Sequence, residues 1–291
     1  MLLPFLLLAA LFVYLFYGTG FYSDDYTELA GNENLSITNF FLIDSSNQGV
    51  FSLVSSFFHR LFILLLGSNE QLYFIPKALT SFLSVYFSYK FFTSFFSKHN
   101  SLLMAVFFVF FPVHDSSNYC FSCLKYNITA ALVMFSHYLM LSNRLKIGLT
   151  VGFLGSFYDY SSPPYTFGLS LYFLLKKKFK LFWLFLLPGL SYVAYYFVNT
   201  LLLNLNEGRI EPEINILKFI KQYALQVFTF IDVAIGPSFW FKIYYAFTEL
   251  TLSSIVVGIS LAILFYQFFE TRKEKAPKEL LLSVCLIVLL A

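Results

Sequence analysis

Charged residues are scarce in this chain. They make up 12% of its 291 residues, against roughly a quarter in an average soluble domain. Hydrophobic residues make up 58%, and the 40 phenylalanines and 21 tyrosines exceed what a soluble core could bury. The mean hydropathy is +0.72. The net charge of +3 gives no reason to expect nucleic acid or an acidic partner. The composition therefore predicts an all-α, polytopic integral membrane protein.

Cysteine is also scarce, with Cys120, Cys123 and Cys285 in the whole chain. Cys120 and Cys123 form a C-x-x-C, but a zinc site needs about four ligands and the sequence has no second pair. A thioredoxin-like redox motif would need a βαβ context, which is missing. We interpret the pair first as two small apolar residues, second as a local disulfide and third as a redox motif. No cofactor is predicted.

Apolar runs of about 20 residues mark the candidate membrane spans. We expect about seven or eight transmembrane helices, at residues 1–18, 72–92, 102–113, 126–141, 147–157, 165–175, 181–203 and 245–269. Several of these runs are shorter than a full crossing. Residues 49–67 are apolar too, but His59 and Arg60 stand at their middle. Because charge is costly at the bilayer centre, we expect this segment to be an interfacial helix in the first outer loop.

These helices belong to one transmembrane domain over residues 1–291. Residues 1–203 form its core, residues 204–244 an outer loop with an interfacial aromatic segment, and residues 245–291 the C-terminal helices. We expect the first run to be an uncleaved helix, since no Lys or Arg precedes it. Residues 280–291 reach only about 18 Å as a helix, so either the last helix is partial or the sequence is a fragment of a longer chain.

Positive charge gathers on one side of this topology. With the N-terminus inside, the Lys and Arg clusters around residues 90–98, 144–146, 176–180 and 272–278 face the cytoplasm, as the positive-inside rule requires. Acidic residues such as Asp24, Asp159 and Asp232 fall in the loops on the other side. The outer face is therefore where we expect a polar site.

The first apolar run is followed by "SDDYTE", in which Asp24 and Asp25 are adjacent. Two like charges side by side are unfavourable. One interpretation is a helix start, in which Ser23 is the cap and both carboxylates are solvated in the first turn. The other is a functional site that uses a carboxylate.

The arrangement resembles the polyprenyl-phosphate-dependent glycosyltransferases of the GT-C class, which include protein O-mannosyltransferases and the lipid A aminoarabinose transferase. That family has an acidic pair after its first span and then an interfacial helix; here "SDDY" is followed by "HRLFILLLGSNEQLYFIPK". The resemblance covers residues 1–203. Two features depart from the family pattern: Lys77 stands where arginine is usual, and "SSNQGVF" stands where the family has a proline-rich segment.

The resemblance implies transfer of a sugar from a polyprenyl-phosphate donor to a lipid or glycan acceptor, on the non-cytoplasmic face of a bacterial inner membrane. The acceptor hydroxyl needs a general base, which we assign to Asp24, with Asp25 and Glu28 shaping the acceptor groove. The leaving phosphate needs cations and hydrogen-bond donors. The residues assigned to it are His59, Arg60, Lys77 and Lys125.

Each assignment has an alternative. His59 and Arg60 suit an interfacial helix without any substrate, and Lys77 and Lys125 suit a membrane boundary. A structural hydrogen bond suits Asp159 better than a substrate contact does. No metal ligand is assigned. A divalent ion at Asp24 and Asp25 is an alternative that the resemblance leaves open, because some GT-C enzymes use one, but chelation by both carboxylates would require the pair to lie in a loop.

Two other functions belong to different classes. A transporter or flippase for a lipid-linked glycan would line a path with charged residues in mid-span, whereas the charges here fall at the edges of the expected spans. A non-catalytic scaffold subunit would have its cationic residues far from Asp24.

Overall fold

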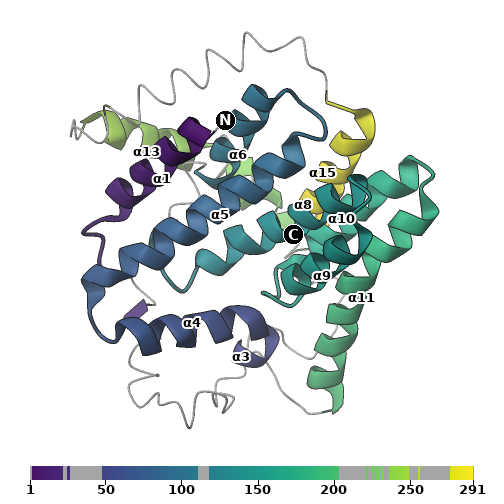
Figure 1. Cartoon of the computed structure of the whole chain (residues 1–291), viewed down its shortest axis with the longest axis horizontal. Helices are drawn as coiled ribbons and strands as arrows, with labels where there is room; N and C mark the ends of the chain where they lie inside the picture. Colours follow the sequence, from purple (N-terminus) through teal and green to yellow (C-terminus); the bar gives the residue numbers. More distant parts are fainter. Residues whose placement is uncertain are drawn as a thin grey trace.

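The computed structural model describes residues 2–21, 25, 26, 48–110, 118–202, 236–248 and 276–290, together with residues 221, 224, 225, 227–229, 231, 232 and 255. Within these residues the regular secondary structure is helical and no strand occurs, which confirms the all-α prediction (Figure 1). The expected outer loop and the expected span at 245–269 lie largely outside them.

The apolar runs became helices with boundaries close to those expected. The elements are α1 (Leu2–Phe16), α3 (Gln48–Phe51), α4 (Leu53–Leu66), the 3₁₀ helix η1 (Glu70–Tyr73), α5 (Phe74–Phe92), α6 (Lys98–Val109), α8 (Leu124–Leu141), α9 (Leu145–Ser156), α10 (Ser162–Leu175), α11 (Phe179–Leu202), α13 (Pro237–Thr248) and α15 (Lys278–Leu290).

Two local expectations need correction. The segment 49–67 is two helices, because the chain breaks at Ser52 between α3 and α4. The run 72–92 begins with the end of η1, whose N-cap Asn69 accepts a hydrogen bond from the Gln71 N–H. The two adjacent prolines stand in the first turn of α10, where a missing N–H costs nothing, and so they separate α9 from α10 as expected.

The helices pack around two main apolar clusters. α5 packs against α1, α6 and α8, with Phe12, Phe16 and Val85 fully buried between them. α10 packs against α11 and α15, and Phe173 and Phe185 are buried there. Most of the described charges lie in the connections or in the first or last turn of a helix.

Helix length bears on the membrane prediction. Among the described helices, one is long and apolar enough to cross a bilayer: Phe179–Leu201 has 23 residues and a mean hydropathy of 1.7. Shorter apolar helices occur at Phe5–Phe16, Leu53–Leu66 and Leu145–Ser156. The 12 residues of α9 reach about 18 Å against a hydrocarbon core of about 30 Å. The count of seven or eight spans therefore stays a prediction.

Two basic segments that are far apart in sequence meet at one end of the bundle. The Lys176 ammonium, just after α10, lies 2.8 Å from the Glu279 carboxylate in the first turn of α15. This contact brings residues 176–180 and Lys278 to the same end. In Figure 1, α4 lies across the opposite end, near the start of α5.

Close contact between α10 and α15 depends on Gly168. A Cβ atom at this position would lie 2.9 Å from the backbone nitrogen of Ile287 and 3.0 Å from the carbonyl oxygen of Ser283, and it would also meet the Ile287 side chain. We expect Gly168→Leu to lower the free energy of unfolding by about 1–3 kcal/mol, as overpacked cores do. Thermal unfolding in detergent measures this. Leu175→Ala, which changes an exposed side chain on the same helix, is the control, and equal melting temperatures for the two variants would contradict the packing.

Candidate active site

Asp25 lies in the acidic segment after α1 and is buried, with 1% of its surface exposed. Its Oδ2 accepts a hydrogen bond from the Phe121 N–H (2.9 Å), and its Oδ1 accepts one from the Ser122 N–H (2.8 Å). The Cys120 thiol also donates to Oδ1, at 3.3 Å. A buried carboxylate is stable only when its oxygens are hydrogen-bonded. Asp25 therefore joins the segment after α1 to the turn before α8.

Lys77, in the first turn of α5, is completely buried. Its ammonium donates to the carbonyl oxygens of Gly20 (2.6 Å) and Thr19 (3.3 Å). The negative charge of Asp25 acts on it as well. A buried ammonium needs such partners. The chain after α1 is thus held at two points. Lys77 binds its carbonyl groups, and the Asp25 side chain binds the turn at 120–122.

Aromatic rings enclose this pair of charges. The Tyr73 ring lies 4.5 Å from that of Phe21 and 4.9 Å from that of Phe121, centroid to centroid. The Tyr73 hydroxyl donates to the Gly67 carbonyl at 2.9 Å. His59, on α4, has its ring 4.7 Å from the Phe121 ring. These contacts exclude water from Asp25 and bring α4 to the edge of the site.

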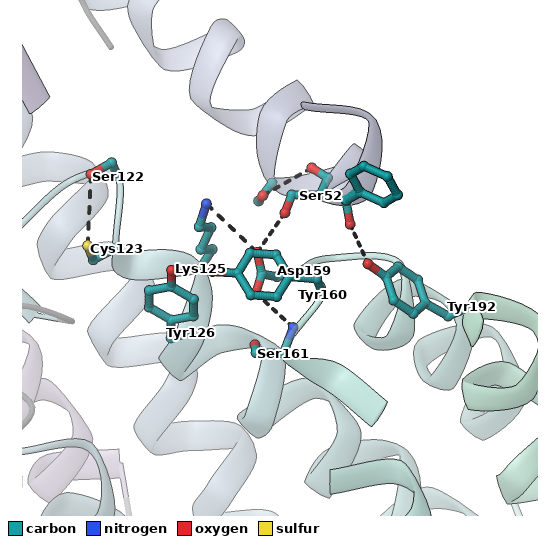
Figure 2. Close-up of polar contacts among 11 residues, drawn as sticks. Ser52, Ser122, Cys123, Lys125, Tyr126, Asp159, Tyr160, Ser161 and Tyr192 are labelled. Carbon is teal, nitrogen blue, oxygen red and sulfur yellow. Dashed lines mark hydrogen bonds and ion pairs between the residues drawn. The ribbon is translucent and has the colours of Figure 1, made fainter. Parts of the chain in front are cut away.

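A second buried carboxylate, Asp159, lies in the connection between α9 and α10 (Figure 2). Its Oδ1 accepts a hydrogen bond from Ser52 Oγ at 2.7 Å and lies 3.8 Å from the Lys125 ammonium. Its Oδ2 accepts a hydrogen bond from the Ser161 N–H at 3.0 Å. These contacts match the expectation that Asp159 makes a structural hydrogen bond. Burial and the charge of Asp159 raise the pKa of the neighbouring Tyr158, which stays a neutral phenol.

Lys125 lies over two aromatic rings in addition to its ion pair. Its ammonium is 5.6 Å from the centroid of the Tyr126 ring and 5.9 Å from that of Tyr160, and the two tyrosine hydroxyls are 3.0 Å apart. Cation–π contacts of this kind add to the ion pair. Figure 2 shows Lys125 and Tyr126 beside each other on one side of Asp159.

Backbone contacts dock α3 and α4 onto the bundle. The Val54 and Ser55 N–H groups, in the first turn of α4, donate to the carbonyl oxygens of Phe157 and Tyr158, both at 3.2 Å. Because the first N–H groups of a helix have no partner within it, this loop acts as the cap of α4. Two tyrosines of α11 complete the attachment: Tyr192 donates to the Phe51 carbonyl at 2.6 Å and Tyr195 to the Val50 carbonyl at 2.9 Å.

The structure brings some of the predicted site residues together and separates others. Asp25, His59 and Lys77 lie around the turn at 120–122. Lys125 is three residues beyond that turn, but it pairs with Asp159 and not with Asp25. Arg60 is half-buried on α4 next to His59. Asp24 and Glu28 lie outside the described residues.

One prediction about the acidic pair is wrong. The helix-start interpretation required solvated carboxylates, whereas Asp25 is buried and hydrogen-bonded across 96 and 97 residues of sequence. The expectation that Asp25 lines an acceptor groove also has to change, since three donors already occupy its oxygens. Asp25 holds the segment in place. The assignment of Asp24 as general base stays a prediction.

Sequence reasoning missed most of the partners in this site. Ser52, Phe121 and Ser122 act through a hydroxyl or through backbone N–H groups, and no residue pattern marks such donors. The C-x-x-C was the one visible signal near the turn, since Cys120 lies against Asp25. In the part of the chain that is described, no three His, Cys, Asp or Glu side chains gather closely enough to hold a metal ion.

Comparisons with known proteins add no identity to this geometry. The chain matches no protein-family model, no curated protein and no solved structure. Function must therefore be argued from the site itself.

The role of Asp25 as an anchor gives a direct stability prediction. Asparagine has the same shape but one acceptor oxygen and a donor NH₂ group, so Asp25→Asn leaves a buried backbone N–H without an acceptor. We expect the free energy of unfolding to fall by about 2–4 kcal/mol. Thermal or denaturant unfolding in detergent measures the change.

Glu279→Gln is the matched control. It removes a carboxylate whose partner, Lys176, is on the surface, and exposed ion pairs contribute little to stability. An Asp25→Asn variant that melts together with Glu279→Gln would show that the buried hydrogen bonds of Asp25 do not hold the fold.

Proposed function

We propose that this chain is an integral membrane glycosyltransferase of the GT-C type. It spans the membrane about seven or eight times and moves a sugar from a polyprenyl-phosphate donor to a lipid or glycan acceptor on the non-cytoplasmic face. The observation that carries the proposal is the anchored acidic pair: Asp25 is locked among His59, Lys77 and the turn at 120–122. Asp24 is the residue before Asp25 in the sequence, and we assign it the role of general base.

The two carboxylates divide the work in this proposal. Asp25 accepts hydrogen bonds on both oxygens, so they already have donors within the chain. Asp24 acts as general base and removes the proton of the acceptor hydroxyl. The acceptor oxygen then attacks the anomeric carbon, the bond from that carbon to the phosphate oxygen breaks, and polyprenyl phosphate leaves. The transition state resembles an oxocarbenium ion.

Cationic groups near the turn suit the leaving phosphate. His59 and Arg60 lie half-buried on α4, which crosses this end of the bundle (Figure 1). Lys77 directs its ammonium at two carbonyl groups, so its positive charge acts on the phosphate as part of the local field. Lys125 is held by Asp159 and by two tyrosine rings. The acceptor groove is assigned to Glu28.

Surface properties support a membrane location. Large apolar side chains are exposed on α1, α4, α11 and α15, including Leu7, Leu65, Trp183, Leu201 and Leu282. Soluble monomers rarely expose so much apolar surface. The described basic residues 176–180 and Lys278 lie at one end of the bundle, as they would on the cytoplasmic side. The end of the bundle that carries Asp25 and Lys77 is then the non-cytoplasmic one.

The positions of the buried charges weigh against a transporter. A transport path needs ionisable side chains in mid-span. Among the described residues, Lys77 is buried in the first turn of α5, His137 is buried four residues before the end of α8, and Asp25 and Asp159 lie in connections. The test described next also distinguishes an enzyme from a non-catalytic scaffold subunit.

Removal of the base tests the proposal. We expect Asp24→Asn to reduce sugar transfer from a polyprenyl-phosphate donor by roughly 10²–10⁴-fold, the usual contribution of a general base. The melting temperature should change little, because asparagine keeps the shape of the aspartate side chain and the buried hydrogen bonds of Asp25 are left in place. Transfer is measured in detergent or vesicles alongside a melting curve.

Ser23→Ala, next to the pair, is the control for local disturbance and should keep most of the transfer activity. Loss of transfer in Asp24→Asn with an unchanged melting temperature supports the base. Near-normal transfer in Asp24→Asn contradicts the assignment, and absence of transfer in the unmodified chain with every donor favours the scaffold.

A further inference from the structure

Cys120 and Cys123 stand at the two ends of the turn that holds Asp25. The Cys123 N–H donates to the Cys120 carbonyl at 3.2 Å, which closes a tight turn, and Cys123 is the N-cap residue of α8. The residues enclosed by the two cysteines are Phe121 and Ser122. These are the residues whose N–H groups bind Asp25.

The two sulfur atoms lie on the same side of this turn. Ser122 Oγ is 2.9 Å from the Cys120 sulfur and 3.9 Å from the Cys123 sulfur. A hydrogen bond with Cys123 and burial together raise the pKa of the Cys120 thiol. Cα atoms at the two ends of a tight turn lie within about 7 Å, which is the range that a disulfide bridges.

We propose that Cys120 and Cys123 form an intrachain disulfide, which closes the turn that holds Asp25. The sequence alone left this pair open between an apolar pair, a disulfide and a redox motif. The geometry favours the disulfide because both sulfur atoms contact the Ser122 hydroxyl and the two cysteines stand at the ends of one tight turn. The proposal goes beyond glycosyl transfer, and for its state in the cell it depends on this end of the bundle facing an oxidising compartment.

The reaction is a thiol–disulfide exchange with a small or protein disulfide as oxidant. Cys123, half-buried at the α8 N-terminus, is the accessible thiol. It loses its proton, attacks the oxidant disulfide and releases one oxidant thiolate. The Cys120 thiol then loses its proton and attacks the Cys123 sulfur, and the second oxidant thiolate leaves. The chain loses two protons and two electrons, and the oxidant gains them.

Oxidation changes the surroundings of Asp25 in a defined way. The Cys120 thiol stops donating to Asp25 Oδ1. The N–H groups of Phe121 and Ser122 remain, and the covalent loop holds them in the turn. The disulfide form should therefore open less readily at this turn than the dithiol form, because the turn has fewer conformations available when it is closed.

Counting thiols tests the proposal independently of sugar transfer. The purified chain is incubated with a cyclic disulfide as oxidant, alkylated and analysed by mass spectrometry before and after reduction. We expect one adduct, on Cys285, before reduction and adducts on all three cysteines after it. Labelling of Cys120 and Cys123 should fall about tenfold on oxidation and return with a dithiol reductant.

Two variants make the result specific. In Cys285→Ser, no adduct should form before reduction, which shows that Cys285 is not in the bond. In Cys120→Ser, Cys123 should remain alkylatable after treatment with an equimolar cyclic disulfide as oxidant, whose mixed disulfide with a single thiol closes again and is released. Three adducts on the folded, oxidant-treated chain, with a melting curve that confirms folding, would overturn the proposal. A disulfide in the absence of any sugar transfer would uphold it while contradicting the proposed function.

Discussion

A buried carboxylate at the end of the first helix organises this end of the molecule. Burying the charge of Asp25 is costly unless donors surround it, and two backbone N–H groups and a thiol supply them. The same segment gives its carbonyl groups to the buried Lys77. The start of α5, the start of α8 and the exit of α1 must therefore meet at one point. The His59 ring on α4 packs against the Phe121 ring. The position of α4 therefore depends on the same contacts.

Asp159 is a second buried carboxylate at the same end of the bundle, and donors surround it as well. It binds Ser52, between α3 and α4, together with Lys125 at the start of α8. The turn at 120–122 and the start of α8 thus contact both carboxylates. The Ser122 N–H binds Asp25, and Lys125 pairs with Asp159. Together with the loop that caps α4, these contacts fix the arrangement of helices at this end of the bundle. The general base that we propose for this end would need such support, because small misplacements cost much of the rate. The opposite end has an exposed ion pair, which contributes little stability.

The sequence predicted the helices well and the site only in part. Apolar runs gave α5, α8, α10 and α11 within a few residues, because a continuous apolar run leaves the backbone few alternatives to a helix. The break at Ser52 was missed, since it depends on the distant Asp159. Burial of Asp25 was missed for the same reason: its donors are backbone groups almost a hundred residues away, and a backbone N–H has no signature in the sequence. The ion pair between Lys125 and Asp159 was not predicted, because the two residues are distant in the sequence.

The account depends on which side of a membrane each end faces, and that can be measured directly. Glu70→Cys, exposed near the start of α5, and Lys278→Cys, exposed at the start of α15, are each introduced into a chain with Cys285→Ser. Intact cells are treated with a membrane-impermeant maleimide, and labelling is compared with that of the parent chain. The account predicts labelling at Glu70→Cys in intact cells and at Lys278→Cys only after the membrane is opened. Labelling of both positions in intact cells, or of Lys278→Cys alone, would contradict it.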